Sequence, residues 1–197
     1  MLLKHRPPGM SLTILRPSIV GSSYRDPFPG WIDNLISSAA LFFYSGIGLV
    51  KVVKCDGNLV SCNIPVDFVA DHVIVSGALL ANSGKFEVLH IGSSARNPVT
   101  MGLCEQCVNE YWNQNVPKLK VSKCNVTLQK SELQYNVLSM TRAVPALAFR
   151  GVAKILRNPK MKKDSQRWMK LLEKAHLISE TFSHFNCHEW IFDAGKT

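Results

Sequence analysis

The chain has 197 residues, of which 46% are hydrophobic, and its formal net charge is +9 at pH 7. This length and hydrophobic content predict one folded domain, or one and a part, and they exclude wholesale disorder. Six cysteines are too few for a disulfide scaffold, so we expect reduced thiols in an intracellular protein.

The first clear pattern is a short apolar run, Leu12–Leu15, which stops at Pro17. Its apolar residues are continuous rather than alternating, which predicts a strand covered on both faces, as in a parallel sheet. A loop rich in Pro and Gly follows over 26–34. Because open α/β sheets bind ligands at strand carboxyl ends, this arrangement predicts a ligand crevice. Such a strand normally comes late in a doubly wound domain, so we expect the back half of an enzyme.

Residues 34–50 carry no charge but are interrupted by Ser and Gly. A membrane-spanning helix needs roughly 20 apolar residues, so a buried helix running into a loop is the better prediction. Two extended stretches follow, Leu49–Lys54 and Leu59–Cys62, around a turn at 56–58.

A helix is predicted over 68–81, with Asp67 placed to cap its amino end. A strand over 85–91 comes next, and it leads into a second ligand-type loop, Gly92–Pro98. A further helix is expected over 100–113, with its apolar residues on one face.

The strand–helix alternation ends in the polar stretch 117–130, and from Val144 the pattern is helical, with a break at Asn158 and Pro159. We therefore predict an α/β fold divided into three parts. They are an α/β portion over 1–115, a connection over 116–140 and a mainly helical region over 141–197.

Few side chains form a recognisable reactive motif. Cys104 and Cys107 form a Cys-x-x-Cys pair inside a predicted helix without a second pair, so we expect buried structural thiols rather than a zinc or redox site. The histidines have no metal-ligand spacing, and Ser18 and Ser22 lack a nucleophile elbow. We therefore predict no catalytic residue and no metal site.

The positive charge is concentrated between Arg150 and Lys174, where nine Lys or Arg residues face two acidic ones. Three interpretations remain open: a solvated helix face, a contact with an anionic membrane surface, and a docking surface for a phosphate-bearing substrate. No nucleic-acid-binding motif accompanies the charge, so we expect no nucleic-acid partner.

Five stretches together resemble one family. They are Leu-Arg-Pro-Ser-Ile-Val-Gly at 15–21, Pro-Phe-Pro-Gly-Trp-Ile-Asp-Asn at 27–34, Ile-Pro-Val-Asp at 64–67, His-Ile-Gly-Ser-Ser-Ala-Arg-Asn-Pro at 90–98 and Glu-Trp-Ile-Phe-Asp at 189–193. In this order they resemble the alcohol-forming fatty acyl-CoA reductases, also called male-sterility-type reductases. These belong to the extended short-chain dehydrogenases, so the resemblance implies the C-terminal part of a Rossmann-like domain followed by a helical region.

The resemblance implies NADPH-dependent reduction of a long-chain acyl-CoA to a primary fatty alcohol. It also implies attachment to a peroxisomal or endoplasmic reticulum membrane. The loop after the Arg-Pro strand would lie beside the nicotinamide, which assigns cofactor binding to Pro17, Ser18, Ile19 and Val20. The aromatic loop would flank the acyl chain, which assigns substrate binding to Phe28 and Trp31.

Two features of the family are missing from these 197 residues. No lysine has a tyrosine four positions before it, and no Gly-rich loop opens a strand-to-helix turn. We therefore expect a C-terminal portion without the nucleotide-binding half, inactive by itself. The alternative is a non-enzymatic lipid- or membrane-surface-binding protein derived from the substrate domain. A sugar-nucleotide-type relative is disfavoured by the aromatic loop and the helical tail.

Overall fold

The computed structural model describes residues 2–156 and 159–193, which form two compact units. As far as the structure describes them, unit 1 takes in Met1–Ala39, Val60–Pro98 and Trp190–Thr197, and unit 2 takes in Ala40–Leu59 and Val99–Glu189. Each unit is assembled from separate stretches of the chain, so its core depends on contacts between residues far apart in sequence.

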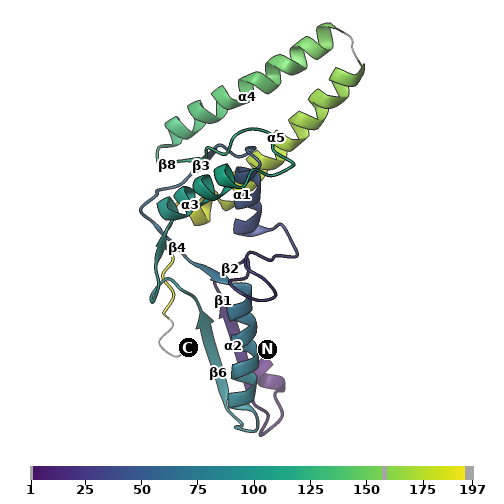
Figure 1. Ribbon diagram of the computed structural model, residues 1–197. Helices are drawn as coiled ribbons and strands as arrows, with labels where there is room; N and C mark the ends of the chain where they lie inside the picture. The colour runs from purple at the N-terminus through teal and green to yellow at the C-terminus, as the bar shows by residue number, and fades with distance from the viewer. Residues whose placement is uncertain (1, 157–158, 194–197) are drawn as a thin grey trace. The chain divides into compact units, whose positions relative to one another are not determined.

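Unit 1 is built on a parallel strand pair. β1 (Leu12–Pro17) pairs with β6 (Phe86–Ile91) in register from Leu12 opposite Phe86 to Pro17 opposite Ile91. Helix α2 (Val66–Leu80) packs along β1 (Figure 1). The predicted strand and its parallel pairing are confirmed. The expected cover on both faces is wrong for the described residues, because 12–15 are only half-buried and 16–17 are exposed.

The chain changes strand partner directly after Pro17. β2 (Ile19–Gly21) pairs in parallel with β5 (Asn63–Pro65), which leads straight into α2. Proline has no N–H with which to continue a ladder, and one residue, Ser18, separates the two pairings. The chain therefore pairs with β6 before Ser18 and with β5 after it. The short elements η1 (Leu2–His5) and β4 (Val60–Ser61) complete unit 1.

Asp67 does not cap α2, contrary to the sequence-based expectation. Pro65 occupies the N-cap position and makes no side-chain capping hydrogen bond. The Asp67 carboxylate instead accepts hydrogen bonds from the backbone N–H groups of Tyr24, Arg25 and Asp26, at distances from 2.7 to 3.3 Å. The carboxylate holds a loop that lies more than 40 positions earlier in the chain, a contact that local sequence could not reveal.

The core of unit 2 gathers around α1 (Ser37–Gly46), β3 (Val52–Lys54) and the loop between them. β3 pairs in parallel with β8 (Thr127–Gln129), with Val52 opposite Thr127. The core residues are at most 7% exposed; they are Ala40, Leu41, Tyr44, Ile47, Leu49, Val50, Val53, Cys55, Val126 and Ala175. The buried helix predicted within 34–50 is confirmed.

Helices make up the rest of unit 2. α3 (Met101–Gln114) follows the short strand β7 (Val99–Thr100), and the Thr100 hydroxyl caps it by accepting a hydrogen bond from the N–H of Leu103 at 3.2 Å. α4 (Glu132–Ile155) and α5 (Pro159–Asn186) lie side by side as a hairpin (Figure 1). β8 and the first turns of α4 lie within the stretch expected to be a connection. The predicted break falls between the two helices, and Asn158 itself is outside the described residues.

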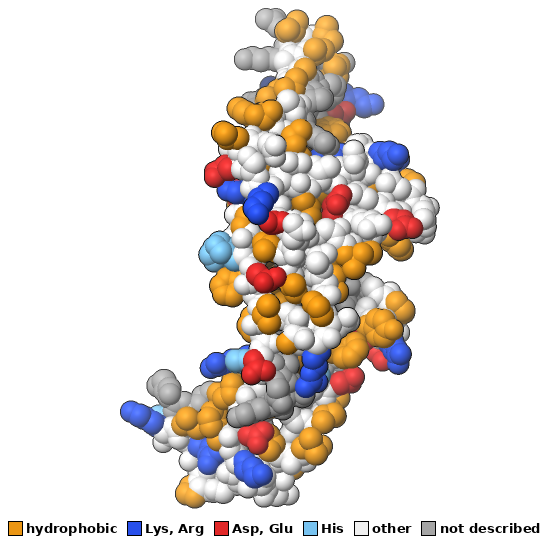
Figure 2. Space-filling model, turned by 90° about the vertical axis from the view of Figure 1, so that its left-hand side faces the viewer, with side chains coloured by type: hydrophobic (Ala, Val, Ile, Leu, Met, Phe, Trp, Pro, Cys, Tyr) orange, Lys and Arg blue, Asp and Glu red, His pale blue; other side chains and the backbone are white. Residues whose placement is uncertain are grey.

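Many large apolar side chains of α4 are open to solvent. They are Leu133, Val137, Met140, Val144, Leu147, Val152 and Ile155. Figure 2 shows hydrophobic side chains gathered over the α4–α5 hairpin. No helix within 2–156 and 159–193 is both long enough and apolar enough to span a membrane.

Candidate functional site

The carboxyl ends of β1 and β6 meet around Cys62. The N–H of Ser18 donates to the carbonyl of Ile91 at 2.9 Å, and the N–H of Ile19 donates to the carbonyl of Cys62 at 3.2 Å. On the other side, a Cβ on Gly92 would lie 3.3 Å from the Cys62 sulfur. The residues that follow β1 and β6 therefore meet at one edge, as expected for a parallel sheet.

Hydrogen-bond donors converge at this edge. Burial raises the pKa of the Cys62 thiol, but the nearby hydroxyls of Ser18 and Ser94 and the N–H groups of Ser94 and Ser93 outweigh it and lower that pKa. Ser94 is itself buried, and its hydroxyl accepts a hydrogen bond from the N–H of Phe192 at 3.0 Å. These donors therefore stabilise negative charge on the Cys62 sulfur.

The four residues assigned to cofactor binding lie together on this edge. Pro17 is exposed, whereas Ser18, Ile19 and Val20 are half-buried. They pass from the end of β1 into β2. Their backbone is held by strand pairing on both sides of Ser18, so their side chains project from a fixed support.

Ser23 organises the loop that holds Phe28 and Trp31. Its buried hydroxyl donates to the carbonyl of Phe28 at 2.6 Å and accepts from the N–H of Trp31 at 3.1 Å. The backbone of Ser23 is also paired with that of Trp31 and Gly30. Phe28 is 58% exposed and Trp31 is half-buried. The loop thus presents an open aromatic side chain from a rigid support in unit 1.

Asp67 should make the free energy of unfolding depend on pH in the acid range. Desolvation raises its pKa, but the N–H groups of Tyr24, Arg25 and Asp26 outweigh it and lower the pKa to about 2. Because the folded-state pKa lies below the unfolded value of 3.8, the stabilisation is present above about pH 4 and disappears as the pH falls through about 2. Urea midpoints measured from pH 2 to 5 should fall less steeply toward low pH in Asp67→Asn than in the wild type. Asp71→Asn, at an exposed position on α2, is the control; equal slopes in all three proteins would contradict the assignment.

Unit 2 contains a separate pocket of about 700 Å³ between α4, α5 and the loop before β3. Its floor is formed by the buried residues Leu49, Val50 and Ala175. At its rim, Leu147 on α4 is 51% exposed and Trp168 on α5 is 39% exposed. The sequence predicted a helical region here but not the pocket, because the helix pairing that forms it could not be predicted.

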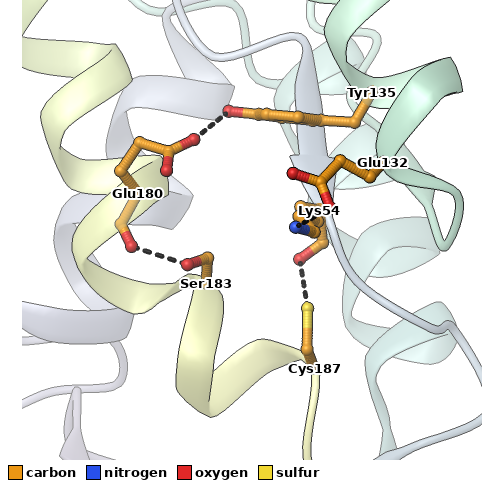
Figure 3. Close-up of polar contacts among 6 residues, drawn as sticks. All are labelled: Lys54, Glu132, Tyr135, Glu180, Ser183 and Cys187. Atoms are coloured by element: carbon orange, nitrogen blue, oxygen red, sulfur yellow. Dashed lines mark hydrogen bonds and ion pairs between the residues drawn. The ribbon is translucent and has the colours of Figure 1, made fainter.

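A set of polar contacts ties both helices to β3 beside this pocket (Figure 3). Tyr135 on α4 is buried, and its hydroxyl donates to the carboxylate of Glu180 on α5 at 3.2 Å. Lys54 on β3 forms an ion pair with Glu132 at 3.3 Å, and the Cys187 thiol donates to the Lys54 carbonyl at 3.6 Å. These contacts fix the amino end of α4 and the carboxyl end of α5 to the same strand.

The structure corrects the expectation for the Cys-x-x-Cys pair. Cys107 is exposed and Cys104 is half-buried, so the pair does not form a buried thiol site. The reason is that α3 has no fully buried residue, because it packs on the core through one side only. Among the described residues, no group of three or more His, Cys, Asp or Glu side chains could hold a metal ion.

Comparison with known proteins shows which proteins this chain resembles in sequence. The family model described as "Male sterility protein", which is an NAD-binding family, matches residues 1–73. The chain is 27% identical over 192 residues to "Fatty acyl-CoA reductase 1" of Xenopus laevis, covering 95% of this chain and 36% of that protein. It is 38% identical over 116 residues to "Probable fatty acyl-CoA reductase 5" of Arabidopsis thaliana, covering 58% of this chain and 23% of that protein. The human protein "Fatty acyl-CoA reductase 1" is 25% identical over 188 residues, covering 93% of this chain and 35% of that protein. The chain is therefore similar to fatty acyl-CoA reductases over most of its own length.

This similarity confirms the resemblance found in the sequence, and the mixed α/β architecture agrees with a Rossmann-like reductase domain. An NAD-binding family model points to a nicotinamide cofactor. The chain spans between about a quarter and about a third of the length of the curated relatives named above.

Proposed function

We propose that this chain takes part in the NADPH-dependent reduction of a long-chain fatty acyl-CoA to a primary fatty alcohol. The observation that carries the proposal is the edge where β1 and β6 end, because residues 15–21 and 90–98 of the family pattern meet there around Cys62. Open α/β sheets bind their ligands at such an edge. The names of the curated relatives supply the reaction class.

Within this proposal, Pro17, Ser18, Ile19 and Val20 flank the nicotinamide, and the cofactor supplies the hydride when bound. The residues suit this role because strand pairing on both sides of Ser18 holds their backbone at the carboxyl edge of the sheet. Ile19 and Val20 add half-buried apolar surface for a flat ring. Phe28 and Trp31 contact the substrate from the loop held by Ser23.

The chain by itself should not catalyse reduction of the acyl-CoA. General acid–base chemistry on the carbonyl oxygen needs a positioned proton donor, and these 197 residues have no tyrosine followed four positions later by lysine. The test is NADPH oxidation by the purified chain with palmitoyl-CoA or stearoyl-CoA, together with detection of the alcohol. Formation of the alcohol would contradict this part of the proposal.

A second candidate function is binding to an anionic membrane surface through the segment from Arg150 to Lys174. The observation that favours it is the row of exposed cations on α5, which includes Lys163, Arg167, Lys170 and Lys174. Positions spaced by three or four residues share one helix face. Cations on such a face attract anionic lipids, and each contributes about 1 kcal/mol near the surface.

Co-sedimentation with vesicles tests this second function. Charge reversal at Lys160, Lys162 and Lys163 should lower binding to phosphatidylserine vesicles at least tenfold, and the loss should shrink at high salt. Charge reversal at Lys118, Lys120 and Lys123, which are exposed and lie outside α5, is the matched control. Equal binding of the wild type to anionic and neutral vesicles would remove this candidate.

A further inference from the structure

We infer that the pocket between α4 and α5 holds the long unbranched alkyl chain of the substrate. This inference rests on the proposed function and assigns to that substrate a site that lies in unit 2 rather than at the strand-end edge. The pocket volume of about 700 Å³ is within the range of sites that enclose small organic ligands.

Several of the polar groups that line the pocket have hydrogen-bond partners within the protein. The Ser122 hydroxyl donates to the carbonyl of Gly48 at 2.8 Å, and the Thr141 hydroxyl donates to the carbonyl of Leu138 at 2.9 Å. The Tyr135 hydroxyl bonds to Glu180 at 3.2 Å and lies 3.4 Å from the Ser179 hydroxyl. A polar ligand would therefore gain little from these groups, whereas an apolar chain would leave none of them unsatisfied.

The apolar lining is continuous from a buried floor to an open rim. The floor residues Leu49, Val50 and Ala175 belong to the hydrophobic core of unit 2. The rim residues Leu147 and Trp168 keep large apolar surfaces in water. A chain of methylene groups that lies from rim to floor would remove this surface from water, so the affinity should rise with the length of the chain.

The two charged side chains in the lining, Lys51 and Glu173, have opposite signs, so the lining carries no net charge. The exposed cations Lys163, Arg167, Lys170 and Lys174 differ from Trp168 and Leu172 in helical phase, so they lie on another face of α5. The pocket thus selects the alkyl chain and not the anionic head group to which the chain is attached.

Binding of palmitoyl-CoA to the 197-residue chain, followed by calorimetry, tests the inference. Palmitoyl-CoA should bind at least tenfold more tightly than CoA alone, and palmitate and 1-hexadecanol should compete with it, because they share the same chain. The variant Leu147→Glu places a charge on the rim and should weaken palmitoyl-CoA binding at least tenfold. Val137→Glu introduces the same charge on α4 at a residue that is 60% exposed and outside the pocket lining, and it should bind like the wild type.

Filling the pocket provides a second measurement. Ser139 lines the pocket and is half-buried, so Ser139→Trp should shorten it. The affinity for palmitoyl-CoA should then fall at least tenfold while that for octanoyl-CoA is retained. Urea midpoints of all variants show whether they remain folded.

Three results would overturn the inference. They are equal affinities for CoA and palmitoyl-CoA, equal effects of the two glutamate variants, and a wild-type dimer that Leu147→Glu converts to a monomer without changing palmitoyl-CoA affinity. The last would assign the groove to a second copy of the chain. These experiments measure binding, so a negative result would not contradict the proposed reductase function. Likewise, the absence of catalytic turnover would not contradict this inference.

Discussion

Replacing Gly48 with alanine should lower the free energy of unfolding by about 3 kcal/mol or more. Gly48 has a φ of +79°, and a Cβ at this position would lie 2.1 Å from the carbonyl oxygen of Ser122. Both the left-handed conformation and the clash with backbone oppose the substitution. The clash cannot be relieved by a side-chain rotation, because Ser122 is held to the loop by hydrogen bonds from its N–H to Ile47 and from its hydroxyl to Gly48. Urea denaturation followed by far-ultraviolet circular dichroism measures the loss.

Two other glycines serve as matched controls. Gly30 has a similar φ of +81° but open space around its Cβ position, so Gly30→Ala isolates the conformational cost and should lose only about 1–3 kcal/mol. Gly77 lies within α2 with nothing nearby, so Gly77→Ala should be neutral or stabilising by up to about 1 kcal/mol. Equal losses for Gly48→Ala and Gly30→Ala would contradict the close approach of Ser122.

Cys55 should react with iodoacetamide about a thousandfold more slowly than a thiol of ordinary pKa. Burial, together with the neighbouring Cys187 and Asp56, raises the pKa of Cys55 from 9.0 to about 12, and only the thiolate is nucleophilic. The thiol also donates to the carbonyl of Asn186 at 2.9 Å, and the residue is 1% exposed. Asn186 is the last residue of α5, so this contact lies at the carboxyl end of that helix.

Mass spectrometry of tryptic peptides, sampled over time at pH 8, measures the alkylation rates. Cys107 on α3 is the internal control, since it is exposed and should label first. The rate at Cys55 should rise sharply in urea as unit 2 unfolds. Comparable rates at Cys55 and Cys107 under native conditions would contradict the burial of Cys55 against the end of α5.

The sequence predicted the elements whose patterns are local. The continuous apolar run of β1, the strand β6 and the helix α3 were all expected within a few residues of their observed bounds. The meeting of the loops after β1 and β6 was also predictable, because parallel strands place their carboxyl ends at one edge.

Features that depend on long-range contacts could not be predicted in this way. Asp67 has the spacing of a helix cap, but its carboxylate bonds to a loop more than 40 positions earlier. Three-residue β8 is too short to give a periodic signal, and it is defined by its pairing with β3. The α4–α5 pocket arises from helix pairing, and the helical pattern predicted from Val144 onward does not show where the two helices pack.

The most direct test of the proposed function replaces a segment of a similar reductase with this chain. The 192-residue stretch of the Xenopus laevis reductase that matches this chain is replaced by the chain itself, and the chimera is assayed with NADPH and palmitoyl-CoA. We expect NADPH oxidation with formation of 1-hexadecanol, because this chain supplies the strand-end residues Pro17–Val20 and the helical unit. A folded chimera that binds NADPH but forms neither aldehyde nor alcohol would contradict the proposed function.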